Sequence, residues 1–204
     1  MVKIALFDYG AGNIFSLKQS LLRGGAEVVD VTRRLLKLNE YDGLVLPGVG
    51  NFDSAISSMK EDISLLKLAI RDKLPVLGIC LGLEMLFDKS EEGSLEGLKL
   101  LDGNVLLLPK KIVKVPHMGW NNLEIIQQGK LLRDIPDNSW VYFVHSYHIS
   151  PRDKTIVTAT SKYGRKLEVA IEKENLFGTQ FHPEKSGTVG AQIIKNFLTI
   201  CKEK

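Results

Sequence analysis

Four short apolar runs in the first half of the chain constrain its fold most strongly, because possible helices separate them. The runs are rich in branched residues, which is typical of strands buried on both faces of a sheet. They are Lys3–Phe7, Glu27–Val31, Gly43–Leu46 and Val76–Ile79. The predicted helices between them are Ile14–Arg23, with Asn13 as its N-cap, Ser54–Met59 and Leu65–Lys73. Strands that alternate with helices predict an α/β fold, with a central, mostly parallel sheet and helices on both faces.

The pattern changes after Gly97, where shorter strand-like runs are separated by turn residues such as Tyr163–Gly164. These runs are Val105–Leu108, Leu123–Ile126, Trp140–Val144, Ile156–Thr160, Leu167–Ile171 and Leu176–Gln180. We expect this half to be rich in antiparallel strands. The amphipathic segment Val189–Ile200 predicts a last helix that packs back on the sheet. Because no repeat or linker interrupts the sequence, we expect residues 1–204 to form a single domain.

Composition narrows the classes of function. A net charge of +3 argues against a nucleic-acid binder with a strongly basic surface, and no apolar run approaches the length of a membrane span. The first residues lack a cleavable signal pattern, so we expect a cytoplasmic location. The two cysteines, Cys80 and Cys201, are too few for a disulfide framework and lack metal-ligand spacing. We expect neither a metal nor a cofactor, and we assign Cys201 no role.

The segment Gly78-Ile79-Cys80-Leu81-Gly82 predicts a nucleophile elbow, because it follows an apolar strand and opens a helical run through Phe87. Glycines two before and two after the nucleophile relieve crowding on such a tight turn. A sulfur atom at a helix N-terminus is expected to favour the thiolate. The alternative is that Cys80 is a small apolar residue in a core strand.

A thiolate nucleophile needs a base, and His182 and Glu184 supply a candidate pair after the run Leu176–Gln180. Residues two apart in an extended backbone face the same side, so the carboxylate of Glu184 can orient the imidazole of His182. Pro183 between them keeps the backbone extended. The alternative is a structural histidine beside a surface glutamate.

Amide hydrolysis also needs donors for an oxyanion. The segment Pro47-Gly48-Val49-Gly50 follows the strand Gly43–Leu46 at the same edge of the predicted sheet as Cys80. We therefore expect the N–H groups of Val49 and Leu81 to form the oxyanion hole. An ordinary strand-to-helix turn is the alternative for this segment.

In these residues the chain resembles the class I glutamine amidotransferases, and most closely the glutaminase subunits of imidazole glycerol phosphate synthases. The elbow and His182-Pro183-Glu184 are shared by many glutaminases. The more specific motifs are Tyr9–Asn13, Pro47–Phe52, Pro116-His117-Met118-Gly119-Trp120-Asn121, Phe143–Tyr147 and His182–Ser186. The resemblance runs from Phe7 to about Ile200.

This resemblance implies a subunit that hydrolyses glutamine and passes ammonia to a cyclase subunit of (β/α) barrel fold, with which it forms a heterodimer. The cyclase then makes imidazole glycerol phosphate and aminoimidazole carboxamide ribotide in histidine biosynthesis. The implied roles are acylation of Cys80, proton transfer by His182 and orientation of that histidine by Glu184. Glutamine would be held by Gly50, Ser146 and Tyr147, and the partner interface would include Asn13, Trp120 and Lys185. Without the resemblance, Trp120 would be read as a core residue and Lys185 as a solvated side chain.

Two residues depart from the family pattern. Glu84 stands where the family usually has glutamine, and His148 stands where a second tyrosine often follows Ser146 and Tyr147. Glu84 follows Cys80 by four residues, so both side chains are expected on one helix face, where the carboxylate would bind the α-ammonium of glutamine. The alternative is that Glu84 points to solvent.

Three other functions compete with this interpretation. The chain could serve as the glutaminase subunit of another synthase, but the Pro116–Asn121 motif argues against this alternative. It could be a noncatalytic regulatory or scaffold subunit, which the complete set of Cys80, His182 and Glu184 disfavours. It could also be a cysteine hydrolase that acts alone, since such enzymes share the elbow, the base and the oxyanion hole.

Overall fold

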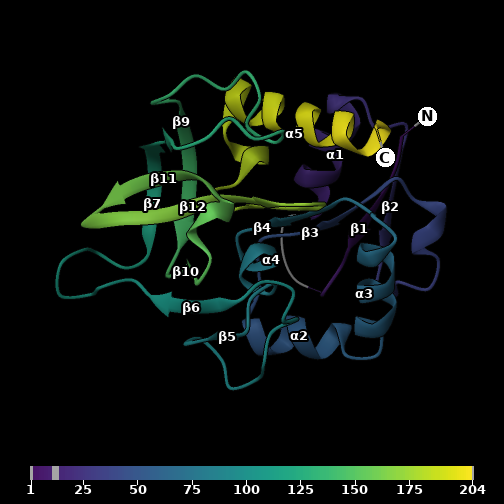
Figure 1. Cartoon of the computed structure of the whole chain (residues 1–204), viewed down its shortest axis with the longest axis horizontal. Coiled ribbons are helices and arrows are strands. Elements are labelled where there is room, and N and C mark those ends of the chain that lie inside the picture. Colours follow the sequence, from purple (N-terminus) through teal and green to yellow (C-terminus); the bar gives the residue numbers. More distant parts are fainter. Residues whose placement is uncertain (1, 11–13, 204) are drawn as a thin grey trace.

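The computed structural model describes residues 2–10 and 14–203, and its centre is an eight-stranded sheet with helices on both faces (Figure 1). The strand order is β2-β1-β3-β4-β13-β12-β11-β8. The bounds are β1 Lys3–Phe7, β2 Val28–Thr32, β3 Gly43–Leu46, β4 Val76–Ile79, β8 Glu124–Ile125, β11 Val157–Tyr163, β12 Arg165–Lys173 and β13 Leu176–Thr179. Both halves of the chain therefore contribute to one sheet.

Neighbouring strands from β2 to β13 in this order pair in parallel, and those from β13 to β8 pair antiparallel. The parallel pairing of β4 with β13 sets Gly78 opposite Gly178 and Ile79 opposite Thr179. Since both strands end there, the residues that follow them, Cys80 and Gln180, leave the sheet at the same edge. The last strand predicted for the antiparallel half thus also completes the parallel part.

The helices divide between the two faces of the sheet, as Figure 1 shows with α1 and α5 on one side and α2, α3 and α4 on the other. Their bounds are α1 Ile14–Gly24, α2 Phe52–Met59, α3 Ile63–Arg71, α4 Leu81–Glu84 and α5 Gly187–Lys202. Leu21 and Phe197 bury one face of the sheet, and Phe52 and Leu66 bury the other. Burial of these amphipathic faces is what holds the layers together.

Two smaller sheets lie beside the main one. One has the order β10-β6-β5, with bounds Tyr147–Pro151, Gly103–Leu107 and Lys89–Ser90. The other is an antiparallel ribbon of β7 (His117–Asn122) and β9 (Trp140–His145), here called the β7–β9 ribbon. The described residues also form the short 3₁₀ helices η1 Leu38–Glu40, η2 Lys154–Ile156 and η3 Pro183–Lys185.

Several predicted elements need correction. The helix predicted from Cys80 through Phe87 ends at Glu84, and β5, β7 and β10 were not predicted as strands. Strand β7 has a polar sequence with no apolar alternation, so its pairing with β9 supplies the order that its own pattern does not indicate. The predicted N-cap Asn13 lies outside the described residues.

Candidate active site

Cys80 occupies a sharp turn between β4 and α4, with φ 47° and ψ −105°. Two close approaches explain the glycines around it. A Cβ at Gly78 would lie 2.6 Å from the carbonyl oxygen of Gly82, and a Cβ at Gly82 would collide with the carbonyl of Leu46. The backbone can therefore make this strained turn only with glycine at positions 78 and 82. The nucleophile-elbow geometry predicted from the spacing of the glycines is confirmed.

The thiol of Cys80 is buried, and its surroundings favour the protonated form. Burial raises the pKa of Cys80 well above its usual value, and the negative charge of Glu84 raises it further. The side chain of Gln180, whose Nε2 lies 3.7 Å from Sγ, and the N–H of Leu81 lower the pKa but do not outweigh burial. The predicted lowering by the helix N-terminus is present, through the N–H of Leu81, but burial outweighs it and the net shift is opposite to the expected one. Helix α4 spans only four residues, too short to offset desolvation.

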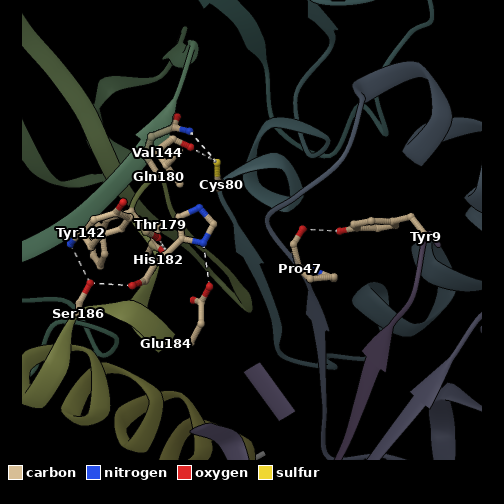
Figure 2. A network of polar contacts seen from close by, with 11 residues as sticks. Tyr9, Pro47, Cys80, Tyr142, Val144, Thr179, Gln180, His182, Glu184 and Ser186 are labelled. Atoms are coloured by element: carbon tan, nitrogen blue, oxygen red, sulfur yellow. Dashed lines mark hydrogen bonds and ion pairs between the residues drawn. The ribbon is translucent and has the colours of Figure 1, made fainter. Parts of the chain in front are cut away.

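His182 and Glu184 form the predicted pair. Nδ1 of His182 lies 2.8 Å from Oε1 of Glu184, and their side chains are 1% and 6% exposed. A carboxylate oxygen accepts, so Nδ1 carries the hydrogen and Nε2 keeps a free lone pair. That Nε2 atom is buried and has no hydrogen-bond partner among the described residues. In Figure 2 one nitrogen of the ring faces Glu184 and the other lies on the side of Cys80.

The backbone of His182 is fixed by its neighbours. Its N–H donates to the carbonyl of Tyr142 at 2.9 Å, and its carbonyl accepts from the hydroxyl of Ser186 at 2.6 Å. The same hydroxyl oxygen accepts from the N–H of Tyr142 at 3.0 Å (Figure 2). The backbone that carries the imidazole is thus held by groups from β9 and from the turn before α5, which the spacing of His182 and Glu184 alone did not predict.

Gly48 brings the thiol and the imidazole together. A Cβ at this position would lie 2.8 Å from Cε1 of His182 and 3.0 Å from Cβ of Cys80. Both groups therefore occupy the space that a larger residue would fill. The sequence indicated Gly48 only as a turn residue, and no sequence signal identified this packing role.

A pocket of about 280 Å³ opens beside Cys80. It contains every residue predicted for the oxyanion hole and for glutamine binding, namely Val49, Gly50, Leu81, Glu84, Ser146 and Tyr147. Glu92, which also lines the pocket, had no sequence signal, whereas Pro116, Val144 and His145 lie in motifs that carry the resemblance but were not predicted as site residues. The carbonyl of Val144 lies 3.8 Å from the sulfur of Cys80. The pocket is large enough for a small polar substrate within reach of the thiol.

Glu84 is buried and lines this pocket, so the solvent-facing alternative is wrong. Its Oε1 accepts a 2.8 Å hydrogen bond from Nε2 of Gln180. Burial raises the pKa of Glu84 to about 8, with a smaller contribution from the charge of Glu92. Burial also raises the pKa of Glu92, whose carboxylate accepts from the N–H of Phe52 at 3.1 Å. Two carboxyl groups with raised pKa values therefore share one wall of the pocket.

The residues expected at a partner interface lie outside this pocket. Trp120 is 52% exposed on β7, so the core-packing alternative is wrong, and its ring meets that of Tyr142 edge-on at 5.9 Å. The ammonium of Lys185 lies 5.9 Å from the centre of the Tyr142 ring. Asn13 lies outside the described residues. Met118 and Trp140, which were not predicted, are also exposed on the β7–β9 ribbon.

Within the described part of the chain, no group of three or more histidine, cysteine, aspartate or glutamate residues is placed to hold a metal ion. Over the same residues, no helix combines the length and the apolar character needed to cross a bilayer.

Relatives with known names share nearly the whole chain. The imidazole glycerol phosphate synthase subunit HisH of Moorella thermoacetica is 45% identical over 200 residues, which cover 97% of this chain and 94% of that protein. The subunit of the same name from Methanocaldococcus jannaschii is 42% identical over 201 residues, which cover 97% and 99%.

Solved structures share the fold at lower identity. A glutamine amidotransferase from Thermotoga maritima has a TM-score of 0.69 at 22% identity, and the match covers 90% of this chain and 76% of that one. A family model described as "Glutamine amidotransferase class-I" matches residues 5–201. The chain therefore belongs to the class I glutamine amidotransferase family.

Proposed function

We propose that this chain is the glutaminase subunit of an imidazole glycerol phosphate synthase, with Cys80, His182 and Glu184 as its catalytic residues. The observation that carries the proposal is the buried Nε2 of His182, which has no hydrogen-bond partner among the described residues and lies on the side of Cys80, while Nδ1 pairs with Glu184. The names of relatives at 42–46% identity over nearly the full length support the choice of synthase.

The reaction begins when glutamine places its side-chain amide against the sulfur of Cys80. His182 Nε2 removes the thiol proton, and the sulfur attacks the amide carbon. The N–H groups of Leu81 and Val49 stabilise the oxyanion. The C–N bond then breaks, and the proton on His182 passes to the leaving nitrogen to release ammonia. Water, activated by the same imidazole, hydrolyses the thioester to glutamate and restores the thiol.

The carboxyl-lined wall of the pocket selects glutamine by its α-ammonium group. Glu84 and Glu92 supply acceptors whose negative charge becomes favourable when that cation binds, a charge-assisted contact of about 1.5–3 kcal/mol. Gly50, Ser146 and Tyr147 hold the remaining polar groups of the substrate. Because burial raises the pKa of Cys80, the reaction starts from the thiol and needs His182 to remove its proton.

The β7–β9 ribbon is the surface on which a cyclase of (β/α) barrel fold docks to form a heterodimer. Its apolar side chains Met118, Trp120 and Trp140 are exposed, as anchors of a protein interface are in a free subunit. Val144 belongs to the same ribbon and lines the catalytic pocket, so ammonia is released next to the partner. Lys185, whose ammonium lies near the ring of Tyr142, extends this interface, and Asn13 is assigned to it from the resemblance alone. The reaction belongs to histidine biosynthesis in the cytoplasm and requires no cofactor.

The test compares Cys80→Ala with Cys201→Ala, which makes the same substitution at the end of α5. In complex with a cyclase, Cys80→Ala should abolish glutamine-dependent synthesis and leave ammonium-dependent synthesis intact, because it removes the nucleophile without touching the acceptor chemistry. Cys201→Ala should retain both. Equal loss of both activities in Cys80→Ala would contradict the proposal. Full glutamine turnover without any cyclase would instead favour a hydrolase that acts alone.

A further inference from the structure

Two buried histidines outside the proposed triad face each other across the β7–β9 ribbon. His117 and His145 are paired in the strand register, and Nδ1 of His117 lies 3.0 Å from Nε2 of His145. Their exposed fractions are 4% and 5%. Since His182 supplies the base of the proposed reaction, the chemistry leaves this pair without a role.

The hydrogen bonds around the pair have a fixed direction. Nδ1 of His145 lies 2.6 Å from the carbonyl oxygen of Tyr147, which can only accept, so Nδ1 carries the hydrogen. Nε2 of His145 then has a lone pair and accepts from Nδ1–H of His117. Nε2 of His117 is left as an acceptor, 3.5 Å from Nδ2 of Asn121. Every hydrogen therefore points from the ribbon toward Tyr147.

The surroundings keep both rings neutral and in place. Burial lowers the pKa of His117 to about 4 and that of His145 to about 3. The ring of His117 stacks on Phe143 and Tyr163, with centroid distances of 4.7 and 3.9 Å. A second hydrogen on His145 Nε2 would face the N–H of His117, so the neutral pair is the one that satisfies all of these contacts.

The chain of hydrogen bonds ends at the turn that lines the pocket beside Cys80. The carbonyl of Ser146 is held by the N–H of Leu108 at 2.9 Å, and the carbonyl of Tyr147 is held by His145. The carbonyl of Val144, one residue before His145, lies 3.8 Å from the sulfur of Cys80. A change in the orientation of the His145 ring would therefore move groups that line the pocket.

On the basis of the glutaminase function proposed above, we infer that His117 and His145 are positioning residues. Through a one-directional N–H chain, they lock the Ser146–Tyr147 turn in the conformation that binds glutamine. The chain starts on β7, which also bears Trp120, so it links the exposed ribbon to the substrate pocket. Neither ring exchanges a proton with the substrate. Loss of the pair should therefore weaken glutamine binding much more than it slows the bond-breaking steps.

The kinetic test uses two substitutions at His117 that separate hydrogen bonding from packing. His117→Phe keeps an aromatic ring between Phe143 and Tyr163 but removes the donor. His117→Asn removes the ring but places an amide nitrogen near the position of Nδ1. In the complex with a cyclase, His117→Phe should raise the glutamine KM about fivefold, the effect of losing one hydrogen bond, and change kcat less than about twofold. The KM of His117→Asn should lie much closer to that of the unmodified chain than the KM of His117→Phe does.

Tyr163→Phe is the matched control, because it keeps the stack on His117 and removes only the hydroxyl, which donates to the carbonyl of Lys114. Its glutamine KM should be unchanged, and ammonium-dependent synthesis should be unchanged in all three variants. An unchanged KM in folded His117→Phe would overturn the inference. So would a loss confined to kcat, or a KM that His117→Asn fails to improve.

A measurement on the unmodified chain tests the hydrogen-bond direction even if the variants fail to fold. Nitrogen-15 NMR of the imidazoles at neutral pH should show both His117 and His145 as neutral tautomers with the hydrogen on Nδ1. A hydrogen on Nε2 of His145 would overturn the inference. Failure of the proposed function would be recognised separately, as a wild-type complex that has the predicted tautomers but no glutamine-dependent synthesis.

Discussion

The catalytic pocket has two walls that are built in different ways. The strand-end wall consists of residues that follow β3 and β4, including Gly48, Cys80 and Glu84, and His182, which follows β13, packs behind it against Gly48. The ribbon wall consists of β9 and the Ser146–Tyr147 turn. In the strand-end wall, neighbouring atoms lie so close to Gly48, Gly78 and Gly82 that there is no room for rearrangement. The ribbon wall, in contrast, is held by side-chain hydrogen bonds, and its outer face is exposed. The proposed reacting groups thus lie on or behind the strand-end wall together with Gly50 and Glu84, whereas Ser146, Tyr147 and the proposed docking face lie on the ribbon side.

The largest expected effect of this difference is on catalysis. His182→Ala, behind the strand-end wall, should lower kcat for glutamine about 10³-fold or more, because it removes the base, with little change in KM. Glu184→Ala should cost less, since Nε2 of His182 remains but its tautomer is no longer fixed. Steady-state kinetics with a cyclase present measure both effects. A fully active His182→Ala variant would remove the triad assignment.

The next effect is on stability, and it compares one glycine from each region. Gly82→Ala should lower the free energy of unfolding by about 3 kcal/mol or more, because the new Cβ meets the backbone of Leu46. Gly119, on the ribbon, has φ +134° but no atom within 4 Å of an added Cβ, so Gly119→Ala should cost only about 1–2 kcal/mol of backbone strain. Urea denaturation measures both. Equal losses would contradict the difference in rigidity.

A smaller effect is expected at the exposed face of the ribbon. Trp120→Ala should weaken cyclase binding by about 10- to 100-fold, as loss of a buried aromatic anchor does, and change the free energy of unfolding by less than about 0.5 kcal/mol. Leu36→Ala is the control, because Leu36 is 62% exposed but lies far from the ribbon in the chain, before η1. Titration calorimetry with the cyclase measures affinity. Equal affinity losses in both variants would contradict a specific docking face.

The smallest effect concerns Glu84, a buried carboxyl group on the strand-end wall whose ionised form is disfavoured by burial. The pKa of Glu84 is about 8 in the folded chain and 4.5 in the reference state, so the folded state binds more protons between these values. Stability should therefore fall as the pH rises from about 4.5 to about 8. Glu84→Gln removes this loss and should stabilise the chain by about 1–2 kcal/mol at pH 8, and by much less at pH 5.

Urea denaturation at the two pH values measures this difference, and an equal pH dependence in both proteins would contradict the buried-acid assignment.

Substitutions at Glu84 also test substrate binding. Glu84→Ala should raise the glutamine KM about tenfold, and Glu84→Gln should restore most of that loss, because an amide oxygen still accepts from the α-ammonium. An unchanged KM in Glu84→Ala would leave Glu84 without a role in binding.

Much of the strand-end wall could be predicted from local sequence. The bounds of β1, β3 and β4 match the predicted runs residue for residue, because apolar, branched segments flanked by turn residues have few other stable conformations. The pairing of His182 with Glu184 was equally local, since residues two apart share a side of an extended backbone. The ribbon wall was harder to predict, because β7 and β10 become strands only through partners far away in the chain.

The sequence by itself determined which groups can react and the order in which they occur along the chain. It also determined the glycines that make the elbow possible, because a turn this tight excludes residues that have a Cβ atom at those positions. Only the tertiary structure decided how those groups are charged and what holds them. It showed Gly48 between Cys80 and His182, joined His117 to His145, and reversed the expected shift in the pKa of Cys80. The physical reason is that burial and electrostatic interactions depend on neighbours in space, which come from every part of the chain.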